Sequence, residues 1–583
     1  MDSQKIENPL NLALDVSATE RERSVDLNFG FDDETNLWEL IVRFNTGLER
    51  AASEIGFSYV ELLANYAIIR IEQSKIERLA SYTEIEFIEK PRRLSFEVAE
   101  ARIISCVPAV EAAPNFLTGK GVIVAIIDSG IDYAHPDFRN EDGTTRILEL
   151  WDQSLIPPDD TLGPPPGYIE GTLFTQERIN QALRQTSMQQ RMAIVPSIDG
   201  TGHGTHVAGI AAGNGRASNG RNRGVATQSD LLVVKLGRSA NDSFPSTTQL
   251  MTGVDYVIKK ALELRRPVAV NLSFGNNYGS HDGRTIVEDF INDAANVWKN
   301  NIIVGTGNEG ASRTHTSGVL EERVSQVIEL AVGDGVPGLN LQIWKNYFDN
   351  FEISIIHPSG NRVGPIQQIL GSQQFNMNQT RVLLYYGEPQ PVNRAQEIYI
   401  DFIPQGEYLT PGIWKFELTP RDIIVGNYDF WLPSVASLGT QTGFLRPVPE
   451  TTLTIPSTAR NVISVGAYDS TTDSYASFSG RGYTRDERLI KPDLVAPGVN
   501  ILAASPGGGY SVRTGTSMAT PFVTGAAALL MQWGIVENND PYLYGEKMKA
   551  YLIKGTRRLP GFQIYPNPSV GWGALCVRDS LPI

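Results

Sequence analysis

Apolar and polar positions alternate in the N-terminal part of the chain, as they do in β-strands with one buried face. Four such runs are separated by two stretches with the apolar spacing of a helix. The pattern predicts strands at residues 38–44, 59–63, 67–71 and 84–89 and helices at 48–55 and 73–81. This order of strand, helix, strand, strand, helix and strand indicates a ferredoxin-like α+β domain, which we assign to residues 1–98.

A second region, residues 314–453, alternates with a period of two and contains no run long enough for a helix. Turn residues separate its apolar runs, which lie at 339–344, 351–356, 380–386, 397–402 and 412–418. Such a series predicts an antiparallel β-sandwich, jelly-roll-like in type. Whether this region binds glycan, binds protein or only stiffens its neighbour stays open at this point.

The remaining segments, 99–313 and 454–583, contain short unbroken apolar runs of the kind buried in parallel sheets. One of these runs, Val124 to Ile127, ends directly in Asp128. A carboxylate at the carboxyl end of such a strand lies where α/β sheets gather their active sites. Taken alone, Asp128 is more often a capping or turn residue.

Two further segments carry candidate catalytic side chains. His203 stands in the glycine-flanked run 199–209 at the start of a predicted helix, and Ser517 opens another helix in the run 515–521. A serine needs a base and a site for the oxyanion it creates, and free N–H groups at a helix N-terminus suit the second need. Ser517 alone could be an N-cap and His203 alone a structural residue, but the order Asp, His, Ser favours catalysis.

These three separated motifs resemble, in residues and in order, those of the subtilisin-like serine proteases. The resemblance implies an α/β catalytic domain with a parallel sheet, formed by residues 99–313 and 454–583. It also implies that Ser517 is the nucleophile of an endopeptidase, that His203 is the general base and then acid, and that Asp128 orients the imidazole.

Other segments resemble the family's substrate site. The strand and glycine-rich turn at 302–310 implies that Asn308 donates a side-chain hydrogen bond to the oxyanion. The segment 268–275 resembles the strand that pairs with the substrate backbone, and places Ser273, Phe274 and Gly275 at the substrate. By the same resemblance Glu309 stands exposed at the mouth of the P1 pocket, where it would modestly favour Lys or Arg.

The N-terminal domain resembles the intramolecular-chaperone prodomain of these proteases. We therefore expect one self-cleavage between Leu94 and Ala101, after which the prodomain stays bound non-covalently to the enzyme. The long interval between Asp128 and His203 predicts an insertion at 140–197 with a helix at about 175–192, and residues 314–453 form a larger insertion. This architecture resembles the clostridial spore-germination (Csp-type) proteases, which activate a protein zymogen by limited cleavage. The alternative is a catalytically silent sensor or scaffold on the same fold.

Composition limits the partners. A net charge of −15 argues against nucleic acid, and no apolar run approaches the roughly 20 residues of a membrane span. The N-terminus lacks the pattern of a secretory signal, so we expect a bacterial protein in the cytoplasm or associated with the spore. The expected partner is a protein or peptide substrate, and no cofactor is expected.

Metal binding and disulfide formation are also addressed by the sequence. The loop 213–224, which binds calcium in many relatives, has three arginines and no carboxylate, so we predict that it binds none. His206 and His135 are interpreted as structural, and no metal site is predicted. Cys106 and Cys576 could bridge the two ends of the catalytic domain, but with only two cysteines in the chain we favour free buried thiols.

Overall fold

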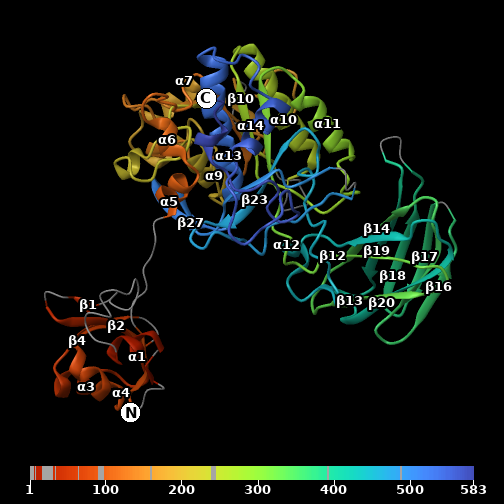
Figure 1. Ribbon diagram of the computed structural model, residues 1–583, viewed down its shortest axis with the longest axis horizontal. Helices are drawn as coiled ribbons and strands as arrows, with labels where there is room; N and C mark the ends of the chain where they lie inside the picture. Colours follow the sequence, from red (N-terminus) through yellow and green to blue (C-terminus); the bar gives the residue numbers. More distant parts are fainter. Residues whose placement is uncertain are drawn as a thin grey trace. The chain divides into compact units, whose positions relative to one another are not determined.

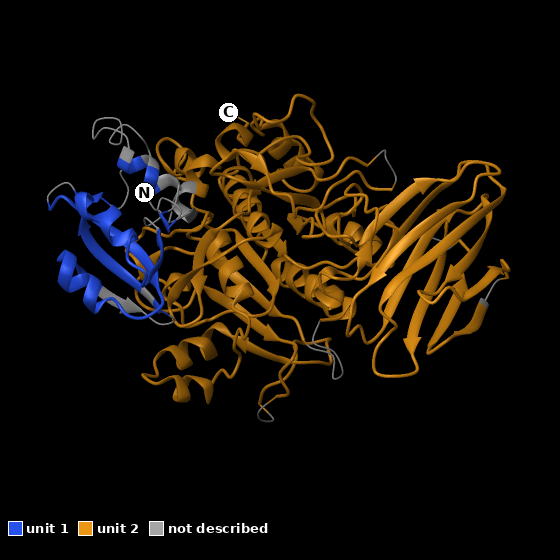
Figure 2. Ribbon diagram, turned by 90° about the horizontal axis from the view of Figure 1, so that it is seen from below, with its two compact units in different colours: residues 1–95 blue, residues 96–583 orange. Residues whose placement is uncertain are grey.

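The computed structural model describes residues 5–582 apart from residues 7, 16–30, 33–34, 63–64, 90–96, 158–160, 238–244, 370, 390–392 and 486–488. The chain divides into two compact units, residues 1–95 and residues 96–583 (Figure 2). Each is described by itself.

The N-terminal unit has the predicted ferredoxin-like order. Its antiparallel sheet follows the path β5-β2-β4-β3, and β1 pairs with the start of β2 (Figure 1). Alternation along β2 sends Trp38, Leu40 and Val42 into the core, where each is fully buried. The elements are α1 (Asn8–Asp15), β1 (Phe31–Asp32), β2 (Leu37–Phe44), α3 (Glu49–Ile55), β3 (Ser58–Leu62), β4 (Tyr66–Glu72), η3 (Gln73–Lys75), α4 (Ile76–Ala80) and β5 (Ile85–Glu89).

The larger unit is built on a sheet in the order β24-β23-β11-β10-β6-β9-β7-β8, with β25 also paired to β23. All its pairs are parallel except those of the edge strands β8 and β24. Helices cover both faces, which is why β6, β10 and β11 are buried along their whole length. The strands are β6 (Ile123–Asp128), β7 (Ile147–Asp152), β8 (Thr172–Thr175), β9 (Asp230–Lys235), β10 (Val268–Leu272), β11 (Asn300–Gly305), β23 (Ile463–Asp469), β24 (Ser474–Tyr475) and β25 (Leu494–Pro497).

Helices α9 and α13 pack against each other and carry two of the candidate residues at their first turns. The helices around the sheet are α9 (His203–Ala212), α10 (Thr247–Glu263), α11 (Ile286–Ala295), α13 (Thr516–Met531) and α14 (Glu546–Lys554), and β26 (Ile501–Ser505) and β27 (Gly509–Arg513) form a hairpin beside them. Contrary to the expectation from the sequence, the segment Thr516–Val536 is long and apolar enough to cross a membrane, the one such helix in the part of the chain described. It is the core helix of this unit, with 83% of the apolar window buried.

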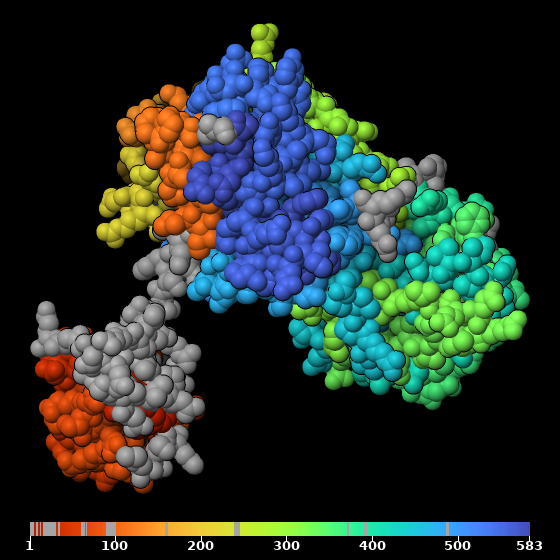
Figure 3. All heavy atoms as spheres, in the orientation of Figure 1, coloured from red at the N-terminus to blue at the C-terminus, as the bar shows by residue number. Residues whose placement is uncertain are grey.

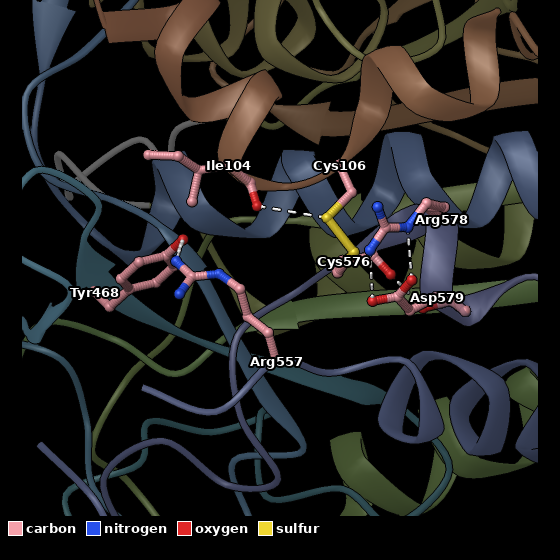
Figure 4. The surroundings of a disulfide bond; sticks show 8 residues. Ile104, Cys106, Tyr468, Arg557, Cys576, Arg578 and Asp579 are labelled. Atoms are coloured by element: carbon pink, nitrogen blue, oxygen red, sulfur yellow. Dashed lines mark hydrogen bonds and ion pairs between the residues drawn. A yellow bond between two sulfur atoms is a disulfide. The ribbon is translucent and has the colours of Figure 1, made fainter. Parts of the chain in front are cut away.

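The ends of this unit are joined by a disulfide bond (Figure 4). Cys106 lies between α5 (Glu97–Ile104) and α6 (Val107–Glu111), and Cys576 immediately precedes α15 (Val577–Ser580). The expectation of free thiols is therefore wrong. Helices α6 and α15 pack together and bring the two Cα atoms to 5.0 Å, a distance that spacing along the sequence could not reveal.

The first insertion extends the sheet with β7 and β8 and adds two helices, α7 (Gln176–Leu183) and α8 (Met188–Met192). The single helix expected at 175–192 is thus divided. Ser187 caps the second helix, with its hydroxyl accepting the Gln190 N–H at 3.2 Å. This capping box starts a new helix where the apolar spacing alone suggested continuity.

The second insertion is an antiparallel β-sandwich, whose residues form the green-to-cyan lobe in Figure 3. One sheet has the order β12-β21-β14-β19-β18-β17 and the other β16-β15-β20-β13-β22. Successive strands from β12 to β15 switch between the sheets, as in a jelly roll, and Phe351, Phe402 and Phe416 fill the core between them. The elements are β12 (His315–Val319), β13 (Gln326–Val332), β14 (Leu339–Asn346), β15 (Asn350–Ile356), β16 (Arg362–Ile366), β17 (Gly371–Met377), β18 (Thr380–Tyr386), β19 (Ala395–Pro404), β20 (Gly412–Asp422), β21 (Asn427–Trp431), α12 (Val435–Leu438) and β22 (Gly443–Phe444).

Candidate active site

The candidate site lies where neighbouring parallel strands end. Ile127 of β6 pairs with Leu272 of β10, which pairs with Val304 of β11. The residues that follow, Asp128 and Ser273, therefore leave the same edge of the sheet side by side.

Asp128 and His203 form the closest contact of the site. The Asp128 side chain is fully buried, and its Oδ1 lies 2.7 Å from Nδ1 of His203 and accepts the Ser129 N–H at 2.7 Å. A proton on Nδ1 would be donated to this Oδ1 and leave Nε2 free to accept a proton, whereas Oδ2 has no partner among the described residues. Burial alone would lower the pKa of His203, but the charge and hydrogen bond of Asp128 outweigh it and raise that pKa above its ordinary value.

Asp199 organises the loop that carries His203, a role that the sequence reasoning did not assign. Its carboxylate accepts the N–H and hydroxyl of Thr205 at 2.8 and 2.7 Å, the Gly202 N–H at 2.9 Å and the Ser129 hydroxyl at 2.8 Å. Burial opposes its charge, yet these hydrogen bonds lower the pKa of Asp199. The signal in the sequence was a carboxylate just before a glycine-rich helix start.

Ser517 lies in the first turn of α13, after Gly515 at φ 153°. Its hydroxyl donates to the Ser273 carbonyl at 3.3 Å, and among the described residues it forms no hydrogen bond with His203. The Ser273 hydroxyl in turn donates to the Ser517 carbonyl at 3.4 Å. The candidate nucleophile and the candidate base thus lie in one site, but no hydrogen bond connects them in the described residues.

Asn271 ties these strands and helices together and was also missed. It is fully buried in β10, where its amide donates to the Ser273 hydroxyl at 2.9 Å and its carbonyl oxygen accepts the Thr524 hydroxyl of α13 at 3.0 Å. A buried amide that is bonded at both ends fixes the spacing of its two neighbours. In the sequence it is the one polar residue of an apolar strand.

Asn308 follows β11 and faces solvent beside the start of α13. Its Oδ1 accepts the backbone N–H of Thr516 at 3.0 Å and the Thr516 hydroxyl at 3.2 Å. Only the amide oxygen of Asn308 can accept a hydrogen bond from the Thr516 N–H. This contact therefore fixes the orientation of the amide and leaves Nδ2 free to donate.

The other predicted substrate residues differ in their surroundings. The ring of Phe274 lies 5.9 Å from that of His203, centroid to centroid. Gly275 is exposed. A Cβ at this position would collide with the side chain of Thr454, so only glycine allows Thr454 to pack this closely. Glu309 is not exposed as expected: it is 6% accessible, and its Oε2 accepts the Thr314 hydroxyl at 3.1 Å and the Val435 N–H at 3.5 Å.

The two histidines that were predicted to be structural, His206 and His135, contact the backbone. Nε2 of His206 lies 2.9 Å from the carbonyls of Ile501 and Ser511, and burial lowers the pKa of His206 to about 4. Nε2 of His135 lies 2.9 Å from the Gly509 carbonyl. Both contacts agree with structural roles.

The prediction that the loop 213–224 binds no calcium stays a prediction. In that loop the Arg216 guanidinium donates to the carbonyls of Asn140 and Glu141. These oxygens are the kind that a cation would otherwise use.

Two family models match this chain. A family model described as the Csp protease B prodomain matches residues 4–92, and one described as the subtilase family matches residues 119–333 and 428–573, more than half of the chain. The gap between the two parts of the second match lies within the β-sandwich.

One solved structure and two curated proteins illustrate the similarity. The structure of the Clostridium perfringens CspB protease is 37% identical, with a TM-score of 0.76, and the match covers 83% of this chain and 96% of that one. The minor extracellular protease Vpr of Bacillus subtilis is 24% identical over 492 residues, 80% of this chain but about half (52%) of that protein. The major intracellular serine protease of Bacillus subtilis is 25% identical over 260 residues, 44% of this chain and 64% of that protein. The chain therefore belongs to the subtilase family of serine proteases and carries a prodomain of the CspB type.

Proposed function

We propose that this chain is a serine endopeptidase in which Asp128, His203 and Ser517 form the triad and Asn308 stabilises the oxyanion. The observation that carries the proposal is the 2.7 Å contact between Asp128 Oδ1 and His203 Nδ1 at the same sheet edge as Ser517. A histidine held in this tautomer is a base for a neighbouring hydroxyl.

In the proposed reaction the Ser517 hydroxyl leaves the Ser273 carbonyl and gives its proton to Nε2 of His203 as its oxygen attacks the scissile carbonyl. Nδ2 of Asn308 and the Ser517 N–H donate to the resulting oxyanion. His203 then protonates the leaving amine, and water hydrolyses the acyl-enzyme on Ser517 by the same steps. Catalytic hydrogen bonds are often long or misaligned before substrate binds. The position of the Ser517 hydroxyl is therefore compatible with these reaction steps.

A catalytically silent sensor or scaffold is the second candidate. The specific observation in its favour is that the Ser517 hydroxyl donates to the Ser273 carbonyl and not to His203. On that hypothesis the site would bind a peptide without acylation.

The domain assignment of the proposal follows the sequence. Residues 1–98 would be a prodomain, cut once by the enzyme itself and then bound non-covalently, and residues 314–453 an insertion in a catalytic domain of residues 99–313 and 454–583. We further propose that the enzyme activates a protein zymogen by limited cleavage, as the resemblance to the spore-germination proteases suggests. Because disulfides are rare in a reducing cytosol, the Cys106–Cys576 bond favours a spore-associated location over the cytoplasm.

The test is covalent labelling with a serine-directed phosphonyl fluoride. We expect wild type to be labelled at Ser517 and to lose all peptidase activity, and Ser517→Ala to be neither labelled nor active. Asp128→Asn serves as a second variant, because it should slow labelling while leaving the serine in place. Folded wild type that binds peptide but never labels at Ser517 would support the scaffold instead.

A further inference from the structure

The six-stranded sheet of the β-sandwich carries a small pocket on its outer face. The pocket has a volume of about 190 Å³, and its walls include the aromatic side chains Trp344, Tyr385 and Tyr399 and the carboxylates Glu388 and Glu397. We call these five residues the acidic aromatic pocket.

Strand register explains why four of these side chains meet. Trp344 of β14 pairs with Glu397 of β19, and Tyr399, two residues further along β19, pairs with Tyr385 of β18. Residues directly opposite on neighbouring strands, and residues two apart on one strand, share a face of the sheet. The opposite face holds the apolar neighbours Ile398 and Ile400 in the core. The pocket is thus a product of the regular sheet.

Neither carboxylate of the pocket has an ion-pair partner among the residues that the structure describes. One cation does lie near the pocket: the Arg485 guanidinium is 6.0 Å from the ring centroid of Trp344, but its ion pair is with Asp429. Glu397 Oε1 accepts a hydrogen bond from Gln342 at 2.7 Å, but burial dominates and raises the pKa of Glu397. A partly buried carboxylate without a cation is costly, and a cation that entered the pocket would remove that cost.

The indole N–H of Trp344 also lacks a hydrogen-bond partner in the described part of the chain. Trp344 is only 5% exposed, and its buried Nε1–H has no acceptor among the described residues. Buried indole N–H groups normally find an acceptor. Its nitrogen is closed to solvent in this structure, so an acceptor on a ligand reaches it only if the indole turns toward the pocket. A ligand that made both contacts would combine a positive charge with a nearby hydrogen-bond acceptor.

A basic residue in a peptide has both properties. Its ammonium or guanidinium group can lie against the exposed ring of Tyr385 and pair with the carboxylates, and its backbone carbonyl is an acceptor for the indole N–H. A neutral saccharide could stack on the rings but would leave both carboxylates without a counter-charge. We propose that the acidic aromatic pocket binds a Lys or Arg side chain of a protein substrate, remote from the bond that is cut.

This assignment to a substrate rests on the proposed function, and the packing of the sandwich supports it. Gln342, which donates to Glu397, also accepts the Gly279 N–H at 2.9 Å through its Oε1. Gly279 belongs to the loop that continues from the expected substrate strand at Ser273. Gln342 therefore links Glu397 of the pocket to the loop that follows the expected substrate strand.

The binding test uses full-length Ser517→Ala, which cannot turn over a ligand, with Nα-acetyl-lysine methylamide and the uncharged Nα-acetyl-norleucine methylamide as probes. Binding is followed by calorimetry in this background and with Glu397→Gln, Glu388→Gln or Tyr399→Leu added. Glu407→Gln is the matched control, because Glu407 is an exposed carboxylate of the same sandwich outside the pocket. Thermal unfolding checks that each variant is folded.

We expect the lysine probe to bind, the norleucine probe to bind at least about tenfold more weakly, and Glu397→Gln to weaken lysine binding by a similar factor. Glu407→Gln should leave it unchanged. Equal affinity for the two probes, no lysine binding at millimolar concentration, or unaltered binding in all three pocket variants would each overturn the proposal. Since these readouts need no catalysis, their failure is distinct from failure of the proposed function, which a short peptide substrate reports separately with the Ser517-intact enzyme.

Discussion

Oδ1 of Asn308 lies 3.0 Å from the backbone nitrogen of Thr516, the residue immediately before Ser517. This hydrogen bond joins the turn after β11 to the first residue of α13. It fixes the amide so that Nδ2, and not the oxygen, can face a substrate carbonyl.

Asn308→Ala should therefore lower kcat by about 10²–10³ with little change in KM, the loss known for one such donor in subtilisin. The reason is that Nδ2 would contact the oxyanion more strongly than the ground-state carbonyl. Steady-state kinetics on a short peptide would measure the split. A KM increase with unchanged kcat would mean that Asn308 only binds substrate.

The pH dependence of activity should follow His203, which must be neutral to accept a proton. Because Asp128 raises the pKa of His203 above its ordinary value, the rate should fall on the acid side at a pH above the reference value of about 6.5. Asp128→Asn removes the raising cause, so the acid limb should move to lower pH while kcat falls by about 10⁴. The profile of kcat/KM for both proteins provides the check, and an unshifted limb in Asp128→Asn would assign that limb to another group.

Glu309 should matter more for stability than for specificity. Glu309→Ala leaves the Thr314 hydroxyl and the Val435 N–H without their acceptor and should lower the free energy of unfolding by about 1–3 kcal/mol. Glu309→Gln keeps the shape and should change the preference for Lys over Leu at P1 by no more than about twofold. Chemical denaturation and a P1 peptide series measure the two effects. A large loss of basic P1 preference in Glu309→Gln would restore the sequence-based view of an exposed carboxylate.

The catalytic candidates could be predicted from the sequence because each lies in a short local motif. Asp128 directly follows an apolar strand, and His203 and Ser517 each open a helix, so chain order and spacing were sufficient. The alternation of the sandwich strands was equally local. These features depend on neighbours within a few residues.

Two of the features that were missed depend on distant neighbours. The buried Glu309 accepts a hydrogen bond from Val435, which lies 126 residues further along the chain, after the last long strand of the β-sandwich. The pairing of Cys106 with Cys576 spans 470 residues and needs the packing of α6 on α15. Local patterns carry no record of such contacts, because they arise only once the sheets and helices have assembled.

The disulfide should stabilise the larger unit. Cys106→Ala combined with Cys576→Ala removes a bond across 470 residues and should lower the free energy of unfolding by about 2–4 kcal/mol, since the unfolded chain gains freedom. Denaturant unfolding of wild type and variant, each with and without reductant, measures the difference. Reductant should shift the wild-type transition toward that of the variant and leave the variant unchanged. Equal transitions for the two oxidised proteins would show that the bond contributes no stability.

Self-cleavage should occur just before α5. The expected range was Leu94 to Ala101; residues 94–96 lie outside the described residues, but Glu97–Ile104 is helical. A protease that pairs with its substrate as an added strand needs an extended segment, so a cut inside α5 would require unwinding of its first turn. The bonds between Leu94 and Glu97 are therefore favoured, and the tether to the active site should make the reaction fast.

Expression of wild type and Ser517→Ala side by side, followed by N-terminal sequencing, provides the test. Wild type should yield two fragments that remain together on gel filtration, with the new N-terminus at residues 95–97, and Ser517→Ala should remain a single chain. A triple substitution of residues 94–96 by proline should block the cut in wild type, because proline lacks the N–H and the freedom of φ that strand pairing requires. Cleavage of Ser517→Ala at the same bond would assign the reaction to another protease, and a new N-terminus beyond residue 97 would show that α5 unwinds before it is cut.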